Sequence, residues 1–423
     1  MGKFVVVLSG GWARAAGHLG ALLALEREGM KPEVIVGTAG GALVGALYWA
    51  TGGSAEGAKE EYYRLVEKYS WQDLMDVNFL QLLRAVDQPS EARGLLEGQR
   101  LFHLLVKETS LRRKGFQHLP GDLFVVTADL NDGQECIFCR YTQEQLFPGE
   151  PPAFRLFAQT EAYLEEVNVA TAVWASLLIP PLFTPLRVRA KALASGELLT
   201  RRAVELALAL PKVERVLVHH VGYAHKLRDE FARLGLGVLT LESHSLAAEQ
   251  QFLGLLEGMA SAEASVRLLD PGLASVSEVE LSKTQELVES ARRTLASIME
   301  KAPLFGDASS LAAALSQEEG RWTVRSAGSA LLLRDEKAPA VEEMAWDFDE
   351  YVEKIGERRL RERWPINTAE WLWQEARENA GGRLWWLLLK KWVRLTYDEV
   401  VLALREFIRT PILQTALQWL DTT

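Results

Sequence analysis

The 423-residue sequence is poor in cysteine, has no excess of basic residues and lacks long apolar runs. Its two cysteines cannot build a disulfide framework, and they favour a reducing compartment. The formal net charge of -10 argues against nucleic-acid binding, because phosphate recognition needs a basic surface. No stretch approaches the roughly 18 apolar residues of a membrane-spanning helix. We therefore expect a soluble, cytoplasmic protein.

The first residues also lack the patterns for export and lipidation. The apolar run from Met1 to Leu8 ends at Ser9, which is too short for the hydrophobic part of a secretion signal. Val6 stands where the N-myristoylation pattern needs Ser or Thr. These absences agree with a cytoplasmic location and leave peripheral membrane binding open.

What the sequence does contain is a regular alternation of strand-like and helix-like segments over its first part, residues 1–243. Strand patterns are found at 3–8, 34–36, 122–128, 215–221 and 237–241, with a hairpin partner at 135–141. Helical spacing is found at 15–28, 42–50 and 224–234. This alternation predicts an α/β domain with a mainly parallel sheet between two layers of helices.

From residue 244 to 423 the pattern changes. Segments with helical spacing, rich in Glu, Arg, Ala and Leu, occur at 246–269, 279–299 and 340–363. Two short strand-like stretches near 321–334 predict a small hairpin across Ala327-Gly328-Ser329. We therefore predict a second, mainly helical region after the α/β domain.

One turn of the predicted sheet has the form of a nucleophile elbow. The apolar strand Val34-Ile35-Val36 runs into Gly37-Thr38-Ala39-Gly40-Gly41, and a helical segment follows. Hydrolases present a catalytic serine on such a strand-turn-helix unit in the frame Gly-x-Ser-x-Gly. Ala39 occupies the centre of the frame, and its methyl group cannot attack a carbonyl carbon.

Five segments in a fixed order resemble the patatin-like phospholipase (acyl hydrolase) family. They are Leu8 to Gly20, Gly37 to Leu43, Thr127 to Gly133, Ala175 to Phe183 and Leu193 to Leu198. The resemblance covers residues 1 to about 240 and implies a three-layer α/β/α fold. It also implies a Ser-Asp dyad that hydrolyses lipid acyl esters through an acyl-enzyme. Backbone N–H groups of the family's glycine-rich loop form the oxyanion hole.

The sequence departs from the family at each part of that machinery. The nucleophile position is Ala39, and the position of the dyad aspartate is Ser195, which is no base at neutral pH. The oxyanion-loop positions read Gly10-Gly11-Trp12-Ala13-Arg14-Ala15, so that Trp12 and Ala15 replace glycines. We predict a catalytically inactive member that acts as a lipid-binding, regulatory or scaffolding protein, with a lipid or fatty-acyl ligand and no cofactor or metal.

The alternative is an acyl-ester hydrolase with a relocated nucleophile, for which Ser176 and Ser195 are the candidates. Ser9 is also near the site in the family arrangement, whereas Thr38 should point away from the pocket. Each candidate needs a base, and we expect His18 to be a packed residue of a helix.

Two further groups of residues invite a metal or redox interpretation. His219 and His220 are adjacent on a strand and so face opposite sides of it, and His225 and His244 complete no zinc-like spacing. Cys136 and Cys139 lie three residues apart on a predicted strand, which also points them to opposite faces. We expect all of them to be structural.

The last part of the sequence is rich in tryptophan. Of thirteen tryptophans, those after residue 340 are Trp346, Trp364, Trp371, Trp373, Trp385, Trp386, Trp392 and Trp419. The segment 383–394 joins large apolar residues to a short basic patch. We favour a buried helix with its cationic side chains reaching water, and a lipid surface or a protein partner are the alternatives.

Overall fold

The computed structural model describes residues 2–69, 96–112, 114–149, 153–158, 167–180, 183–221, 247, 250–273 and 281–337. Residues 1–75 and 98–344 form one compact unit, which contains almost all of them. The elements predicted at 224–234, 237–241 and 340–363 and all tryptophans after residue 340 lie outside the described residues. Within the part of the chain that the structure describes, no helix is both long and apolar enough to cross a membrane.

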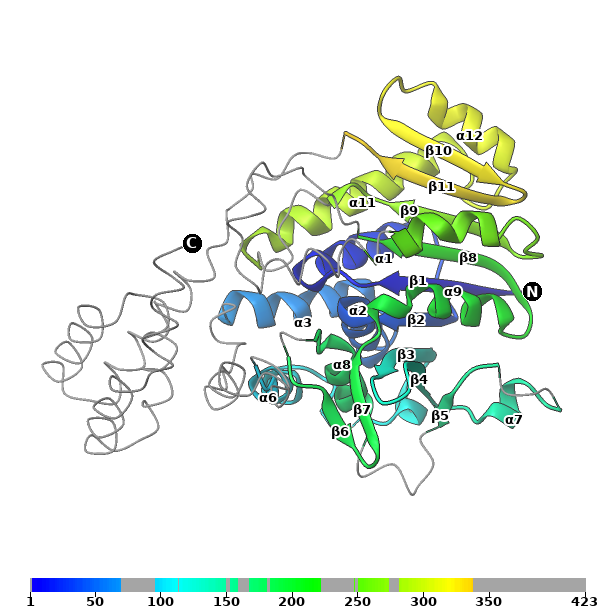
Figure 1. The fold of residues 1–423 in the computed structure, drawn as a ribbon. Coiled ribbons are helices and arrows are strands. Elements are labelled where there is room, and N and C mark those ends of the chain that lie inside the picture. The colour runs from blue at the N-terminus through cyan, green and yellow to red at the C-terminus, as the bar shows by residue number, and fades with distance from the viewer. Residues whose placement is uncertain are drawn as a thin grey trace, which may run out of the picture. The chain divides into compact units, whose positions relative to one another are not determined.

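The described residues build one sheet of eleven strands (Figure 1). The strands are β1 (Lys3–Ser9), β2 (Val34–Thr38), β3 (Asp122–Asp129), β4 (Gln134–Cys139), β5 (Leu156–Ala158), β6 (Leu186–Val188), β7 (Lys191–Ser195), β8 (Val213–His220), β9 (Ser265–Asp270), β10 (Trp322–Ala327) and β11 (Ala330–Asp335). Their spatial order is β10-β11-β9-β8-β1-β2-β3-β4-β5, and β7 pairs with both β3 and β6. The first strand of the chain therefore lies in the middle of the sheet.

The sheet is mainly parallel, as the sequence predicted. β1 is flanked by β2 and β8, and β3, β9 and β11 continue the parallel pairing on the two sides. Short turns join the antiparallel pairs β3 with β4 and β6 with β7, and β7 also pairs antiparallel with β3. Since parallel strands need long crossovers, helices separate most of them in the sequence.

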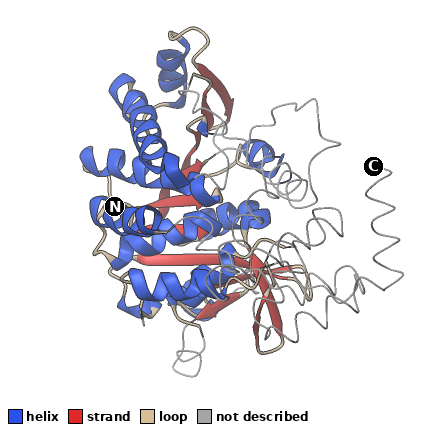
Figure 2. Cartoon of the chain, turned by 90° about the vertical axis from the view of Figure 1, so that its left-hand side faces the viewer, coloured by secondary structure: helices blue, strands red, loops and turns tan. Residues whose placement is uncertain are grey.

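The helices lie on both sides of this sheet (Figure 2). They are α1 (Ala16–Arg27), α2 (Ala39–Ala50), α3 (Ala55–Lys68), α6 (Gln99–Glu108), α7 (Gln143–Leu146), α8 (Val169–Leu177), α9 (Thr200–Ala209), α11 (Thr284–Lys301) and α12 (Ala308–Ser316), with short 3-10 turns η1 (Trp12–Ala15), η3 (Phe116–His118), η4 (Glu197–Leu199) and η7 (Leu281–Lys283). α2 packs on β1, β2 and β3, α1 packs on α11, and α9 packs on β1, β2 and β8.

Alternate side chains of β1 explain why this strand is apolar along its whole length. Val5 and Val7 belong to a buried cluster with Leu206 of α9 and with Phe252. The backbone of Leu8 lies against α2, where a Cβ on Gly41 would overlap the Leu8 carbonyl. Because both faces of the strand are covered by helices, water meets neither set of side chains. The glycine of the predicted turn is therefore required by close packing.

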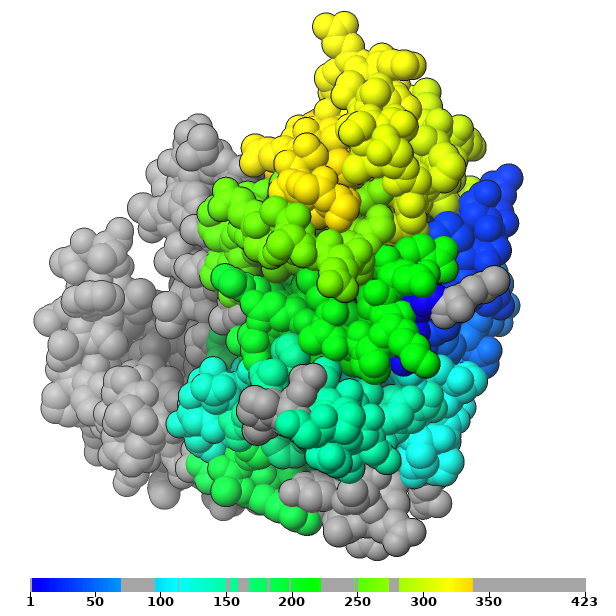
Figure 3. Space-filling view, turned by 90° about the vertical axis from the view of Figure 1, so that its right-hand side faces the viewer, coloured from blue at the N-terminus to red at the C-terminus, as the bar shows by residue number. Residues whose placement is uncertain are grey.

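The sheet continues beyond the predicted boundary at 243/244, through β9, β11 and β10. The segment 246–269 was predicted to be a helix, but its described residues are helical at 247 and 250–258 and then form β9. A short apolar run cannot be assigned to strand or helix by its spacing alone. The predicted hairpin near 321–334 is confirmed by β10 and β11, which pair in register from Trp322–Asp335 to Ala327–Ala330. In the space-filling view the residues of the late strands, drawn yellow-green to yellow, lie directly against the green residues of the earlier part (Figure 3).

Candidate functional site

The elbow predicted from the sequence is present. β2 ends at Thr38 and α2 begins at Ala39, whose φ of 46° lies in the left-handed region. Left-handed backbone is costly for a residue with a Cβ, and a nucleophile elbow is a strained turn of this kind. Ala39 is 0% exposed. The chain thus keeps the strained backbone of the elbow at a residue without a nucleophilic group.

The glycine-rich loop lies directly beside the elbow. Gly10, Gly11 and Trp12 have φ angles of 66°, 95° and 38°, so that three successive residues are left-handed. The N–H of Gly10 donates to Thr38 Oγ1 over 3.0 Å, which ties the loop to the end of β2. Thr38 Oγ1 is therefore occupied with the backbone of the loop.

One backbone donor of the loop is bound to a carboxylate of the same chain. The N–H of Gly11 donates to Glu197 Oε1 over 2.9 Å, and Glu197 is only 1% exposed. Sequence reasoning missed Glu197, although it follows Ser195 by two residues in a segment that was already singled out. The signal that could have found Glu197 is its place two residues after Ser195, the position expected for the dyad aspartate.

The two positions of the expected dyad meet around the end of β3. Ser176 Oγ accepts a 2.8 Å hydrogen bond from the N–H of Ala39 and donates over 2.7 Å to the carbonyl of Val126. Ser195 is the register partner of Thr127, the next residue of β3. Ser195 is buried, and its Oγ accepts from the N–H of Glu197 over 3.3 Å. The structure thus brings both positions to one end of the sheet.

The proposed relocated nucleophiles differ in their surroundings. The single proton of the Ser176 hydroxyl is given to a backbone carbonyl, so that no base can receive it without a rearrangement. Ser9 differs from it, because Ser9 Oγ lies 2.7 Å from Nδ1 of His220. Both residues are buried, and the His220 ring stacks on Phe252 with a centroid distance of 4.0 Å.

Two of the histidines, His18 and His219, form a buried pair. His18 of α1 and His219 of β8 join their Nδ1 atoms over 2.7 Å, on the opposite side of the sheet from His220. Burial lowers the pKa of His219 to about 3, and burial followed by the nearby His219 lowers that of His18. No cluster of three metal-ligating side chains occurs among the described residues. The expectation that His18 packs within its helix agrees with this arrangement.

The two cysteines are free and buried in β4. Burial raises the pKa of Cys136 to about 11 and that of Cys139 to about 12, which keeps both thiols protonated at neutral pH. Only Cys139 belongs to the apolar cluster that contains β1 and α9. Packing, as predicted, accounts for both.

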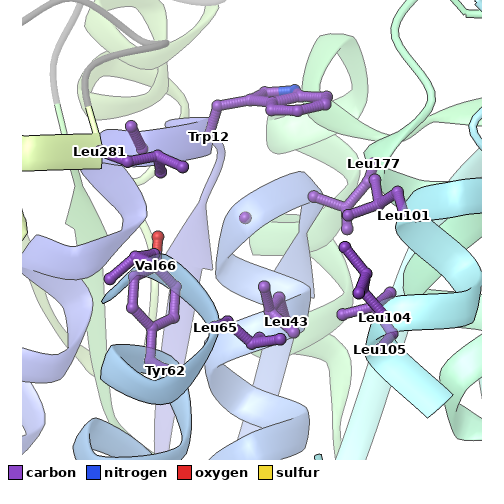
Figure 4. Close-up of a pocket in the computed structure, with 12 residues that line it drawn as sticks. Trp12, Leu43, Tyr62, Leu65, Val66, Leu101, Leu104, Leu105, Leu177 and Leu281 are labelled. Atoms are coloured by element: carbon purple, nitrogen blue, oxygen red, sulfur yellow. The ribbon is translucent and has the colours of Figure 1, made fainter. Parts of the chain in front are cut away.

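An apolar pocket of about 570 Å³, part of it open to solvent, lies next to the loop and the elbow (Figure 4). Its lining consists of Trp12, Ala13, Gly40, Leu43, Tyr62, Leu65, Val66, Leu101, Leu104, Leu105, Leu177 and Leu281. The Trp12 ring spans one end of the pocket in Figure 4, and it stacks on Phe183 with a centroid distance of 5.3 Å. Ala39 and Ser195 are not among the lining residues.

Trp12 and its neighbours therefore have two different roles. Trp12 and Ala13 border the pocket from η1, while the buried Arg14 does not line it. Ala15 packs against the elbow, because a Cβ on Gly40 would stand 2.5 Å from the Ala15 methyl group. Trp12 and Ala15 thus place side chains against the pocket and the elbow, where glycines would have none.

Comparison with known proteins identifies part of the chain. A family model described as patatin-like phospholipase matches residues 6–208. Among solved structures, VipD from Legionella pneumophila aligns with 13% identity over 95% of this chain and 85% of that chain, with a TM-score of 0.31. ExoU from the type III secretion system of Pseudomonas aeruginosa, in complex with SpcU, aligns with 14% identity over 98% and 76%, with a TM-score of 0.27. The family match spans a little less than half of the chain, residues 6–208.

Proposed function

Because residues 6–208 form a domain of the patatin-like phospholipase family, we propose that this domain binds the hydrocarbon part of a lipid without hydrolysing it. The observation that carries the proposal is Ala39. It holds the left-handed backbone at the apex of the elbow, where a hydrolase presents its nucleophile, and it offers only a methyl group. The protein would then act as a lipid-dependent regulator or scaffold.

The surroundings of Ala39 support the absence of hydrolysis. Ser195 replaces the aspartate that would activate a nucleophile, and a serine hydroxyl does not act as a base at neutral pH. The Glu197 carboxylate holds the N–H of Gly11, so that a developing oxyanion would meet a negative charge there. Loss of one oxyanion donor alone costs about 100-fold to 1,000-fold in kcat. The nucleophile, its base and one oxyanion donor are thus all affected.

The pocket supports the binding part of the proposal. Its lining is almost entirely aliphatic, and a mostly apolar lining is typical of small-ligand sites. Transfer of apolar surface from water to such a lining gains about 25 cal/mol per Å². A hydrocarbon chain fits this environment better than any polar ligand.

Two measurements on the full-length protein test the proposal. The first is turnover of a long-chain aryl ester, which should not exceed that of heat-inactivated protein. The second is binding of Nile red, an uncharged polarity-sensitive dye. Leu104→Trp places an indole in the pocket and should abolish dye binding, whereas Leu130→Trp, at a side chain 48% exposed, should preserve it. Ester turnover, or equal dye binding by both variants, would contradict the proposal.

A second candidate is an acyl-ester hydrolase with a relocated serine, and one contact favours it. Ser9 Oγ and His220 Nδ1 are 2.7 Å apart, which is the spacing of a serine and its general base. Neither residue lines the pocket, and both are buried. A fluorophosphonate adduct that maps to Ser9 and is lost in His220→Gln would establish this candidate. An adduct on Ser176 or on Ser195 would instead identify that serine as the relocated nucleophile, as considered from the sequence.

A cytoplasmic location also belongs to the proposal. For the segment 383–394, contact with a lipid surface or a protein partner remains the alternative to a buried helix. Truncation near residue 244 would remove β9, β10 and β11 from the sheet, so substitutions in the full chain are the better test. Trp385→Ala combined with Trp386→Ala should reduce co-sedimentation with lipid vesicles, with Leu130→Ala as the control. Unchanged co-sedimentation would remove the membrane contact from the proposal.

A further inference from the structure

We propose that the pocket is selective for uncharged lipids, such as long-chain alcohols, and that the Glu197 carboxylate excludes free fatty acids from it. This inference rests on the proposed function, because it names the class of ligand that the same pocket accepts. It concerns a residue, Glu197, that lies outside the expected dyad and oxyanion loop.

The lining itself carries no formal charge. Tyr62 and Trp12 supply its polar side-chain atoms, and every other lining side chain is aliphatic or, at Gly40, absent. Burial raises the pKa of Tyr62, so that its hydroxyl stays neutral. A carboxylate brought into such a lining would lose its hydration without gaining a cation, and that loss is large.

One backbone donor beside the pocket is already occupied by Glu197. A carboxylate at the end of an acyl chain would seek the N–H groups of the loop that borders the pocket. The N–H of Gly11, next to the lining residue Trp12, already donates to Glu197. A second carboxylate at this place would face the first one, and like charges in a buried site repel strongly.

Arg14 does not change this balance. It is buried two residues after Trp12, close to the site in the sequence, and neither Arg14 nor Glu197 is without a partner. Since Arg14 already has an interaction within the chain, it is not a free cation for an anionic ligand. An uncharged end group avoids both the desolvation of a carboxylate and the repulsion from Glu197.

The test compares decanol with decanoate, which share a chain length and differ in the charge of the end group. Each compound is titrated into the full-length protein with bound Nile red, and displacement of the dye is measured. The pH is about 8, where a carboxyl group is ionised. Decanol should displace the dye at least about tenfold more strongly than decanoate. Equal or stronger displacement by decanoate would overturn the inference and leave the proposed function intact.

Glu197→Gln then tests the cause of the selectivity. The amide oxygen can still accept from the N–H of Gly11, but the negative charge is gone. The preference for decanol should fall to within about threefold, through stronger binding of decanoate. Glu205→Gln, the same change in α9, should retain the full preference. An unchanged preference in Glu197→Gln would overturn the assignment to Glu197, whereas failure of Nile red to bind at all would overturn the proposed function as well.

Discussion

The N–H of Gly11 donates a 2.9 Å hydrogen bond to Oε1 of Glu197, a residue 186 positions later in the chain. Gly11 belongs to the loop whose backbone would stabilise an oxyanion, and Glu197 follows the position of the lost dyad aspartate. One contact therefore joins two of the altered parts of the site.

Restoring the dyad alone should not restore hydrolysis. Ala39→Ser combined with Ser195→Asp recreates the nucleophile and its base. The Trp12 ring still borders the pocket, however, and Glu197 still holds the Gly11 amide. We expect aryl-ester turnover at the level of the unmodified protein. Addition of Trp12→Gly and Ala15→Gly should be required for activity.

The remaining contribution of Glu197 can be measured in the same background. Glu197→Ala, added to the four-site variant, should raise kcat by about 100-fold to 1,000-fold, because one oxyanion donor is released. Substantial turnover by the dyad revertant alone would mean that Trp12 does not obstruct the oxyanion site.

The backbone at Ala39 should make glycine favourable there. Ala39→Gly removes the penalty of a Cβ at a φ of 46°, which is about 1–2 kcal/mol, against an entropic loss of about 0.4–1 kcal/mol. We expect the free energy of unfolding in denaturant to rise by about 0.5 kcal/mol. Ala46→Gly, inside the same helix, should lower it by about 1 kcal/mol. A loss of equal size at both positions would contradict the strained elbow.

Much of this fold could be predicted from the sequence, because its signals are local. The apolar runs of β1 and β2, and the strand-turn-helix unit at Ala39, follow from periodicity and glycine placement. The strand β9 could not be predicted, since its apolar run continues the helical spacing before it. Glu197 was missed for another reason: its partner is a backbone amide 186 positions away, and no local pattern encodes such a contact.

The buried histidine pair should make stability depend on pH. His219 has a folded-state pKa of about 3, below its ordinary value, and that of His18 is also lowered. Below about pH 6.5 the unfolded chain binds protons that the folded chain refuses, so stability falls as the pH falls from there toward 3. We expect a loss of about 1 kcal/mol per pH unit for each histidine, measured by denaturant unfolding between about pH 7 and pH 5.

Two matched variants show whether the histidine pair causes this dependence of the free energy of unfolding on pH. His219→Gln should reduce it, because the replacement does not titrate and can still hydrogen-bond His18. His103→Gln, at an exposed position of α6, should leave the slope unchanged. Equal slopes in His219→Gln and the unmodified protein would rule out the pair as the source.

The late strands should depend on one buried cation. Arg267 of β9 donates to the carbonyls of Leu304 and Gly306 over 2.7 and 2.8 Å, and to that of Ser329 over 2.9 Å. Arg267→Met leaves these acceptors unpaired and should lower the free energy of unfolding by at least about 3 kcal/mol. Arg293→Met, at a side chain 64% exposed, should change it by less than about 0.5 kcal/mol.

The most direct measurement of the central claim is the intact mass of the full-length protein after incubation with a long-chain fluorophosphonate. The probe reacts with a serine only where a base activates it and donors stabilise the oxyanion. We predict no adduct on the unmodified protein under conditions in which it binds Nile red in the pocket. A stoichiometric adduct on any serine would contradict a domain that binds lipid without hydrolysing it.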